Sequence, residues 1–370
     1  MNYALKGAGR SGARAVACLR NSLLITILLG ACHPSLATAL AGQAAENSVR
    51  LEASHEAMGT MFTIVVYGRD RDFLAEVVEQ AFQEVDRIDA QMSNYKPESE
   101  LSVINREASS HAVVVEPGLF HLLQISLQRS EATGGAFDVT VGPLMKSWGF
   151  FRGRGRLPSP AELAQVLKRV GYQHIKLDAG RRTLRFDEPG VEIDLGGIAK
   201  GYAVDRAVDV LRSNGITSAL VSSGMSSIYA LGSPPGRQGW EISLRSPYDP
   251  RQAGDVFHLE NWSLSTSGNY EKFFKIEGKN YCHIMNPHTG WPVEGRLSAA
   301  VLAATGTDTD GRSAGCFVMG VDGTRKYLER DPNLVVIFYL PDGAPPKYQR
   351  VELRSASYQI PAGSIVDIQK

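Results

Sequence analysis

The sequence has little of what marks several classes of protein. Among its 370 residues only 4 are cysteines, and 39 basic side chains balance 39 acidic ones, so the formal net charge at pH 7 is zero. A protein that follows nucleic-acid phosphates needs a basic excess, which this chain lacks. No long run of one charge marks an interaction tail. A hydrophobic content of 43% is typical of a globular protein with one large domain or two smaller ones.

The N-terminal apolar run, LLITILLGA at residues 23–31, is too short to cross a membrane, which takes roughly 20 apolar residues. Basic residues precede it, so residues 1–31 are interpreted as a secretory signal peptide. The run ends in LLGAC, a pattern similar to the bacterial lipobox, and we expect Cys32 to carry a lipid after cleavage. Cleavage within SLATALAGQA, giving a soluble secreted protein, and Cys32 as a mere part of the leader are the alternatives. Residues 32–50 are expected to form a tether.

The mature body keeps two cysteines, Cys282 and Cys316, because Cys18 and Cys32 belong to the leader region. Two cysteines are too few for a disulfide scaffold. Their apolar surroundings indicate buried thiols, and pairing remains open should the fold bring them together.

Predicted helices and strands come in blocks rather than in alternation. Hydrophobic periodicity predicts a strand at 61–68, helices at 71–92, 118–133 and 160–170, two strands within 174–186, a helix after Lys200, several strands up to residue 285, further helix at 311–331, and late strands at 333–340 and 348–355. This segregation indicates an α+β fold with largely antiparallel sheets and flanking helices. We expect the folded domain over residues 51–355, with 356–370 as a C-terminal tail.

The stretch EIDLGGIAK, residues 192–200, places Asp194, two glycines and Lys200 at the start of a helix. A helix N-terminus attracts phosphate, and Lys200 can neutralise a phosphate oxygen. The stretch fits neither the P-loop nor the dinucleotide fingerprint. Because Asp194 would repel phosphate, its partner is expected to be a metal, a ribose or a ring nitrogen. A capped helix with an internal salt bridge is the alternative.

Three further segments carry residues suited to binding or catalysis. Asp138 and Thr140 lie between glycines in an apolar loop, and Tyr95 offers a flat ring after the first long helix. His283 precedes the tight turn NPHTG and suits general acid–base work. Each segment has a purely structural alternative. The loop with Asp138 and Thr140 could be a simple turn, the segment of Tyr95 a capped turn, and His283 a hydrogen-bonded structural histidine.

Asp308, Asp310 and Ser313 precede an apolar helix, in the segment GTDTDGRSAGCFVMG. Their oxygens are of the kind that Mg²⁺ prefers. Capping of the helix by an aspartate is the alternative.

Taken in order, these segments resemble those of the ApbE family, the FAD:protein FMN transferases. The resemblance runs from Ala57 to Leu340 and rests on MGTMFTI, MSNYKPESELSVIN, GAFDVTVGPL, EIDLGGIAKGYAVDRA, TSGNYEKFF, HIMNPHTGWPV and the helix start TDGRSAGCFVMG. It implies an α+β fold with FAD in a groove between two lobes. It also implies an enzyme that splits the FAD pyrophosphate, moves FMN onto a Thr or Ser hydroxyl of a partner protein as a phosphoester, and releases AMP.

The resemblance also implies roles for single residues. FAD contacts fall on Met58, Tyr95, Ala136, Phe137, Asp138, Asp194, Lys200 and Ile284. Mg²⁺ would lie at the backbone carbonyl of Gly197 and the carboxylate of Asp310, and His283 would be the base. Lys200 and Mg²⁺ would act by positioning and charge neutralisation. The expected partners are FAD, a flavoprotein subunit of a membrane redox complex, and the membrane through the lipid anchor, at the periplasm-facing side of a bacterial envelope.

Two departures from the family pattern leave other functions open. Ala314 stands where members commonly place a metal-binding Thr, so water, the neighbouring Ser313 or Asp308 would have to replace that ligand. The residues MSS, at 225–227, stand where the family usually has GGD. A Mg²⁺-dependent FAD pyrophosphatase with water as acceptor, and a non-catalytic FAD-binding lipoprotein, are the alternatives to the transferase.

Overall fold

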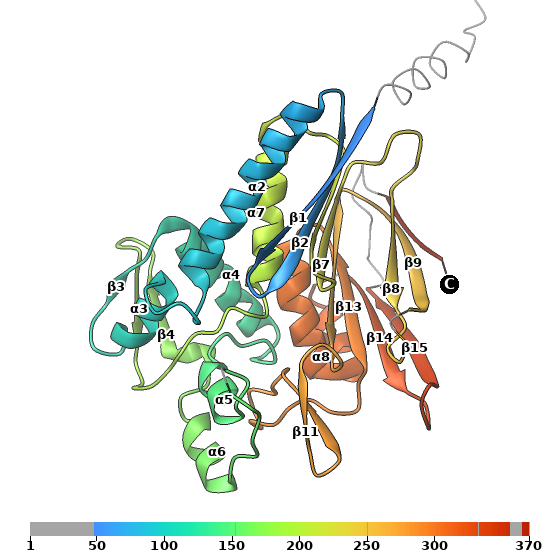
Figure 1. Ribbon diagram of the computed structural model, residues 1–370. Coiled ribbons are helices and arrows are strands. Elements are labelled where there is room, and N and C mark those ends of the chain that lie inside the picture. The colour runs from blue at the N-terminus through green and yellow to red at the C-terminus, as the bar shows by residue number, and fades with distance from the viewer. Residues whose placement is uncertain (1–47, 152, 250, 332, 356–364, 370) are drawn as a thin grey trace, which may run out of the picture.

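A computed structural model describes residues 48–151, 153–249, 251–331, 333–355 and 365–369 (Figure 1). The expected signal peptide, the lipidated Cys32 and nearly all of the expected tether lie outside the described residues. Within the described part, no helix is both long enough and apolar enough to cross a bilayer.

One eight-stranded sheet forms the centre of the fold, in the order β1-β2-β6-β7-β10-β13-β14-β15. Its strands are β1 (Val49–Ala57), β2 (Thr60–Gly68), β6 (Ala219–Ser223), β7 (Ser227–Leu231), β10 (Trp262–Gly268), β13 (Ser298–Ala303), β14 (Val335–Pro341) and β15 (Tyr348–Arg354). Every neighbouring pair in this sheet is antiparallel. The prediction of an α+β fold with largely antiparallel sheets is confirmed.

Smaller sheets and a set of helices complete the described chain. The remaining strands are β3 (Val113–Val114), β4 (Ile175–Asp178), β5 (Thr183–Phe186), β8 (Trp240–Arg245), β9 (Ala253–Glu260), β11 (Phe273–Ile276), β12 (Lys279–Cys282) and β16 (Ile365–Gln369). The helices are α2 (Arg71–Met92), α3 (Glu100–Glu107), α4 (Pro117–Ala132), α5 (Gly142–Ser147), α6 (Pro160–Leu167), α7 (Ala199–Ser213) and α8 (Gly306–Leu328), with a 3₁₀ turn, η1, at Tyr172–His174. In Figure 1, α5, α6 and β11 gather at the lower end of the molecule.

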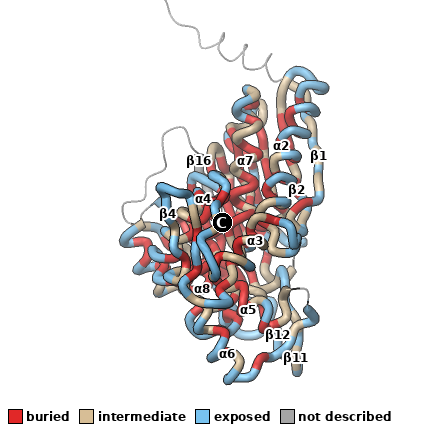
Figure 2. The backbone as a smooth tube through the Cα atoms, turned by 90° about the vertical axis from the view of Figure 1, so that its left-hand side faces the viewer, coloured by how far each residue is buried: buried red, intermediate tan, exposed pale blue. Residues whose placement is uncertain are grey.

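The helices α2 and α7 run side by side along the N-terminal half of the central sheet, and α8 packs on β10 and β13 (Figure 1). Helix α2 forms because apolar residues recur at helical spacing, from Leu74 to Ile88, and because the Asp70 side chain caps its first amides. Helix α7 is largely buried, as the red segments of its tube show in Figure 2. It therefore lies deep enough to present its first turn inside the molecule.

Two large hydrophobic clusters hold the layers together. The first joins α2, α4 and α7 to β2 and β6, with Phe62 and Leu119 fully buried. The second joins α8 to β10, β13 and β14 and to the separate sheet β16-β9-β8, with Phe257 and Phe338 fully buried. Alternate residues of β2 face different clusters, as a strand between two layers requires: Ile64 belongs to the first and Val65 to the second.

Strands β1, β3, β13 and β16 lie outside the ranges in which strands were predicted. Strand β1 alternates half-buried and exposed residues at the edge of the sheet, and its polar outward face hides it from a search for apolar runs. Strand β16 lies within the expected C-terminal tail and pairs with β9, from Ile365 opposite Glu260. Cys282 and Cys316 are both free and buried, so the buried-thiol interpretation is confirmed and a disulfide between them is excluded.

Candidate functional site

The first turns of α7 and α8 cross in close contact at two glycines. A Cβ on Gly201 would lie 2.0 Å from the carbonyl oxygen of Gly306, and a Cβ on Gly306 would lie 2.5 Å from the carbonyl oxygen of Gly201. Only glycine fits at both positions. This contact brings the segment after EIDLGG against the segment after Thr305, which lie about a hundred residues apart in the chain.

At this crossing the buried carboxylate of Asp310 reaches the N-terminus of α7. Its Oδ2 accepts a hydrogen bond of 2.9 Å from the backbone N–H of Gly201. Gly201 is in the first turn of α7, where amides lack partners within the helix and the helix dipole favours a negative charge. Within the described chain, Oδ1 of Asp310 receives no hydrogen bond, so one carboxylate oxygen remains available to a ligand.

Helix α8 begins earlier than predicted. The sequence placed Asp308, Asp310 and Ser313 ahead of the helix, but α8 starts at Gly306 and includes all three. The Thr305 hydroxyl caps it by accepting a hydrogen bond from the N–H of Asp308 at 3.1 Å. Asp308 itself forms an ion pair with Arg129 of α4 at 2.7 Å, and this arginine, rather than a metal, balances its charge.

Gly197 and Ala314 face each other beside the ring of Phe137. A Cβ on Gly197 would lie 3.5 Å from that ring and 3.8 Å from the Cβ of Ala314. The pairing of these positions, predicted from the resemblance, is present in the geometry. The residue at 314 offers only a methyl group toward Gly197.

Ser313 is directed elsewhere. Its hydroxyl donates to the carbonyl of Asp310 at 2.9 Å and lies 2.9 Å from the hydroxyl of Ser267 in β10. The side chain is fully buried against the sheet. This arrangement argues against Ser313 as a metal ligand, because its hydroxyl is already engaged with Asp310 and with Ser267 of β10.

The glycine turn before α7 is fixed by Asp194. Its Oδ1 accepts from the N–H of Gly196 at 2.8 Å, and its Oδ2 accepts from the Asn94 side chain at 3.0 Å. Among the described residues, the ammonium group of Lys200 makes one hydrogen bond, a long one of 3.4 Å to the carbonyl of Gly196. The salt bridge of the structural alternative, between Asp194 and Lys200, is therefore absent from the described chain, and the ammonium group remains available.

The loop AFD, residues 136–138, packs under this turn. Ala136 and Phe137 are buried, and the Phe137 ring contacts Gly311 as well as Gly197. The Asp138 carboxylate accepts three hydrogen bonds, two from Thr140 and one from the N–H of Tyr172. Burial raises its pKa. Asp138 therefore shapes the loop, and any contact to a ligand would come from the loop backbone.

A cleft of about 180 Å³ opens beside Asp194. It is lined by polar and aromatic residues, among them Asn94, Arg106, Lys146, Phe151 and Glu192. The ring of Tyr95, 46% exposed, stacks on Phe151 with 4.6 Å between centroids. Polar groups with an exposed aromatic pair suit a planar heterocycle.

His283 follows β12 and faces a group of charged residues. Its backbone N–H and its Nδ1 both contact the carbonyl of Lys272, at 3.0 and 3.1 Å. The Nδ1 contact to an acceptor assigns the proton to Nδ1 and leaves Nε2 with a free lone pair. Burial, and then the charge of Lys200, lower the pKa of His283 to about 4. The ring is therefore neutral at pH 7 and able to accept a proton.

Glu271 is a site residue that the sequence reading missed. Surrounding protein raises the pKa of its carboxyl, the charge of Lys200 lowers it, and Asp310 raises it again. Glu271 and His283 therefore both lie within electrostatic reach of Lys200, and Glu271 also within reach of Asp310. The only sequence clue to Glu271 is an acidic residue just before a strand. Asn94 and Phe151 were likewise missed, because neither a lone amide nor a lone ring is distinctive.

Two of the expected FAD contacts, Met58 and Ile284, take no part in the contacts described so far. Met58 has a φ of 52° at the tip of the β1–β2 hairpin and packs half-buried on the first hydrophobic cluster. The turn at 224–226 lies against this hairpin, because the N–H of Gly224 donates to the carbonyl of Met61 at 2.7 Å. This turn contains the start of the MSS segment that stands where the family usually has GGD. Ile284 is half-buried on the second cluster, next to His283.

The donor set has limited capacity for a metal. No group of three or more His, Cys, Asp or Glu side chains in the described chain is arranged to hold one. One free carboxylate oxygen with backbone oxygens nearby does not form an all-protein cage. It does fit Mg²⁺, which is often bound by one or two carboxylates together with water and substrate phosphates.

The sequence and the fold are similar to those of one family of known proteins. The model of the ApbE family matches residues 58–338. The FAD:protein FMN transferase of Treponema pallidum is 32% identical over 77% of this chain and 83% of its own length, and that of Salmonella typhimurium is 30% identical over 88% and 93%. The crystal structure of the Thermotoga maritima ApbE protein superposes with a TM-score of 0.75 at 31% identity, covering 84% of this chain and 98% of that one. Flavin transferase ApbE from Vibrio cholerae gives 0.72 at 27%, with the same coverage.

Proposed function

The chain belongs to the ApbE family, and we propose that it is an FAD:protein FMN transferase that moves FMN from FAD to a Thr or Ser hydroxyl of a partner protein. The product would be a phosphoester, and AMP would leave. The observation that carries the proposal is the hydrogen bond between Asp310 and the first turn of α7. At the same helix crossing Gly197 faces Ala314, and Lys200 is close enough to lower the pKa of His283. Three segments far apart in the chain supply this arrangement.

The pyrophosphate of FAD fits at the N-terminus of α7. The first-turn amides and the ammonium group of Lys200 supply positive charge there. The flavin or the adenine would lie in the cleft beside Tyr95 and Phe151, which Asn94 connects to Asp194. In this arrangement one ring system of the dinucleotide lies in the cleft and the phosphates lie next to it, at the N-terminus of α7.

Residues Asp310, through its free Oδ1, and Gly197, through its carbonyl, would hold a Mg²⁺ together with the substrate. Mg²⁺ bound there would neutralise charge on the pyrophosphate oxygens. Ala314 supplies no oxygen, so water would fill that position. Asp310 is already oriented for this task by the N–H of Gly201.

His283 would act as the base. The acceptor hydroxyl gives its proton to Nε2 while its oxygen attacks the FMN phosphorus. The bond from that phosphorus to the bridging oxygen breaks, and AMP leaves with this oxygen. A ring held neutral by burial and by the charge of Lys200 is ready for this transfer.

We further propose that the enzyme is anchored by a lipid on Cys32 at the periplasm-facing side of a bacterial envelope, and that its acceptor is a flavoprotein subunit of a membrane redox complex. The support is the LLGAC pattern after a short apolar run. Replacement of Cys32 by Ser should release the protein from membranes without changing transfer in vitro. Membrane retention of Cys32→Ser would contradict the anchor.

The test of the activity is an incubation of the purified enzyme with FAD, Mg²⁺ and an acceptor domain that carries a Thr flavinylation site. We expect flavin fluorescence on the denatured acceptor and an equal amount of AMP, both abolished by chelation and by Asp310→Ala. AMP without labelled acceptor would instead indicate the pyrophosphatase. Bound FAD with neither product would indicate a non-catalytic binder, the reading that Ala314 keeps open.

A further inference from the structure

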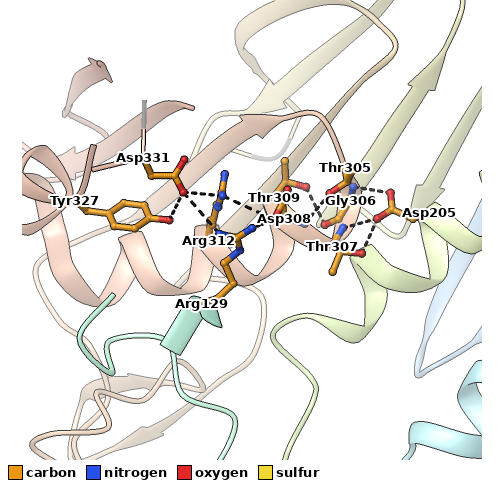
Figure 3. A network of polar contacts seen from close by, with 10 residues as sticks. All are labelled: Arg129, Asp205, Thr305, Gly306, Thr307, Asp308, Thr309, Arg312, Tyr327 and Asp331. Atoms are coloured by element: carbon orange, nitrogen blue, oxygen red, sulfur yellow. Dashed lines mark hydrogen bonds and ion pairs between the residues drawn. The ribbon is translucent and has the colours of Figure 1, made fainter. Parts of the chain in front are cut away.

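Helices α7 and α8 cap each other. Asp310 of α8 accepts from the N–H of Gly201 in the first turn of α7. In return Asp205, one turn further along α7, accepts from the N–H of Gly306 at 2.6 Å, from the N–H of Thr307 at 2.8 Å and from the Thr307 hydroxyl at 2.6 Å. Figure 3 shows Asp205 reaching the start of α8 in this way.

Asp205 supplements the cap that begins α8. Thr305 already caps the helix through the N–H of Asp308. Asp205 instead engages Gly306 and Thr307, whose amides Thr305 does not reach. Burial raises the pKa of Asp205 to about 6 even with its three hydrogen bonds, so these bonds offset only part of the cost of keeping the buried carboxylate charged.

The geometry of the helix connects this clamp to the site. Residues four apart share a face of a helix, so Gly306 and Asp310 both face α7, where the close Gly201–Gly306 contact excludes a side chain. On another flank, Asp308 pairs with Arg129 of α4 at 2.7 Å, as Figure 3 shows. The first turn of α8 is therefore held from two sides, which fixes its rotation and the direction of Asp310.

We infer that Asp205 is a positioning residue of the transferase, which acts through Gly306 and Thr307 to hold the Asp310 carboxylate where it binds the metal. The inference rests on the proposed function, because it assigns Asp310 to Mg²⁺. Asp205 itself touches neither substrate nor metal. Removing the hydrogen bonds of Asp205 should weaken metal binding more than it slows the chemical step.

The experiment compares Thr307→Val, which removes one of the three hydrogen bonds, with Thr307→Ser, which keeps it, and with Asp205→Asn. Asp209→Asn is the matched control: Asp209 lies one turn further along α7, half exposed, in an ion pair with Arg206 at 2.6 Å. For each variant we would measure the Mg²⁺ concentration that gives half-maximal transfer. Binding of Mn²⁺ in the presence of FAD, followed by the electron paramagnetic resonance of the free ion, reads the site without turnover.

We expect Thr307→Val to raise two quantities about fivefold: the Mg²⁺ concentration for half-maximal transfer and the dissociation constant of Mn²⁺. Fivefold is the factor that corresponds to one hydrogen bond of typical net strength. Asp205→Asn should raise them further, with kcat recovering at saturating metal, while Thr307→Ser and Asp209→Asn stay within about twofold of wild type. Thr307→Val keeps the test valid if Asp205→Asn does not fold.

Unchanged metal requirements with a lowered unfolding temperature in Thr307→Val would overturn the inference, since the clamp would then serve only the fold. Asp310→Ala is the reference that separates the two proposals. If Asp310→Ala abolishes metal binding and the clamp variants do not affect it, only the inference fails. If wild-type transfer needs no Mg²⁺, both fail.

Discussion

Gly201 and Asp310 are joined by a hydrogen bond of 2.9 Å between the backbone N–H of one helix and the side chain of another. The bond exists because Gly201 has no side chain: its Cβ would lie 2.0 Å from the carbonyl oxygen of Gly306 and 2.7 Å from the Cβ of Asp310. Steric fit and electrostatics therefore meet at the same residue, and a substitution there affects both.

Gly201→Ala should lose most transfer activity and destabilise the fold. Alanine is the better helix former, by about 1 kcal/mol, so any loss must come from the clash with Gly306. Overpacking of this kind costs about 1–3 kcal/mol. Denaturant unfolding and the metal requirement for transfer would be measured together. Gly180→Ala is the control, since its Cβ would meet nothing closer than 3.4 Å; equal behaviour of the two variants would contradict the packing argument.

The sequence predicted many elements of the fold where one face of an element is apolar, but it missed the fully buried central strand β13. Helix α2 and strand β2 were found because their buried residues follow the period of the element. Strand β1 was missed because its outward residues, such as Arg50 and Glu52, are charged at a sheet edge. The predicted start of α8 was late because polar residues in its first turn, Thr307 to Asp310, look like a loop until their partners in α7 are known.

The site shows the same limit. Motifs located Asp194, Lys200, His283 and Asp310, since each belongs to a recognisable segment. Side chains that act through other segments were not found. Asp205 occupies an ordinary polar position on an amphipathic helix, and its two partner residues, Gly306 and Thr307, lie about a hundred residues away. Ser313 was one of the candidates to replace the metal ligand missing at Ala314, whereas its side chain is turned toward Ser267.

His283→Gln should reduce kcat by about 10²–10⁴, the usual contribution of a general base, and leave FAD binding nearly unchanged. In the wild type the pKa of about 4 means that this base stays unprotonated down to mildly acidic pH. The rate of transfer should therefore show no loss assignable to His283 between pH 8 and pH 5. An acid limb near pH 6.5 that disappears in His283→Gln would contradict the lowered pKa.

The same histidine should make stability depend on pH. Its folded pKa, about 4, lies below the ordinary value of 6.5, so the unfolded chain binds the proton more readily in that window. The free energy of unfolding should then fall as pH drops from 6.5 toward 4. Urea unfolding at pH 7 and pH 5 measures this, and the difference should be smaller in His283→Gln. An equal difference in both proteins would assign the effect to other groups.

Tyr95→Ala should weaken FAD binding by about 2- to 10-fold, because an aromatic pair contributes about 0.5–1.5 kcal/mol beyond the area it buries. The stack on Phe151 at 4.6 Å holds the ring at the cleft, so Tyr95→Phe should bind like the wild type. Quenching of FAD fluorescence gives the dissociation constant. A loss of affinity in Tyr95→Phe equal to that in Tyr95→Ala would assign the contribution to the hydroxyl and contradict stacking.

Ala314→Thr should lower the Mg²⁺ concentration needed for half-maximal transfer. The Cβ of Ala314 faces Gly197, 3.8 Å from where a Cβ would be at that glycine, and a hydroxyl there would add the oxygen that Mg²⁺ prefers over a methyl group. Ala314→Val is the matched control, because valine has the shape of threonine and no hydroxyl. We expect a reduction of several-fold in Ala314→Thr, of the size of one added oxygen contact, and none in Ala314→Val. If both variants raise the requirement, the added volume disturbs the packing against Phe137, and Ala314 is then a packing position that the chain cannot exchange for a ligand.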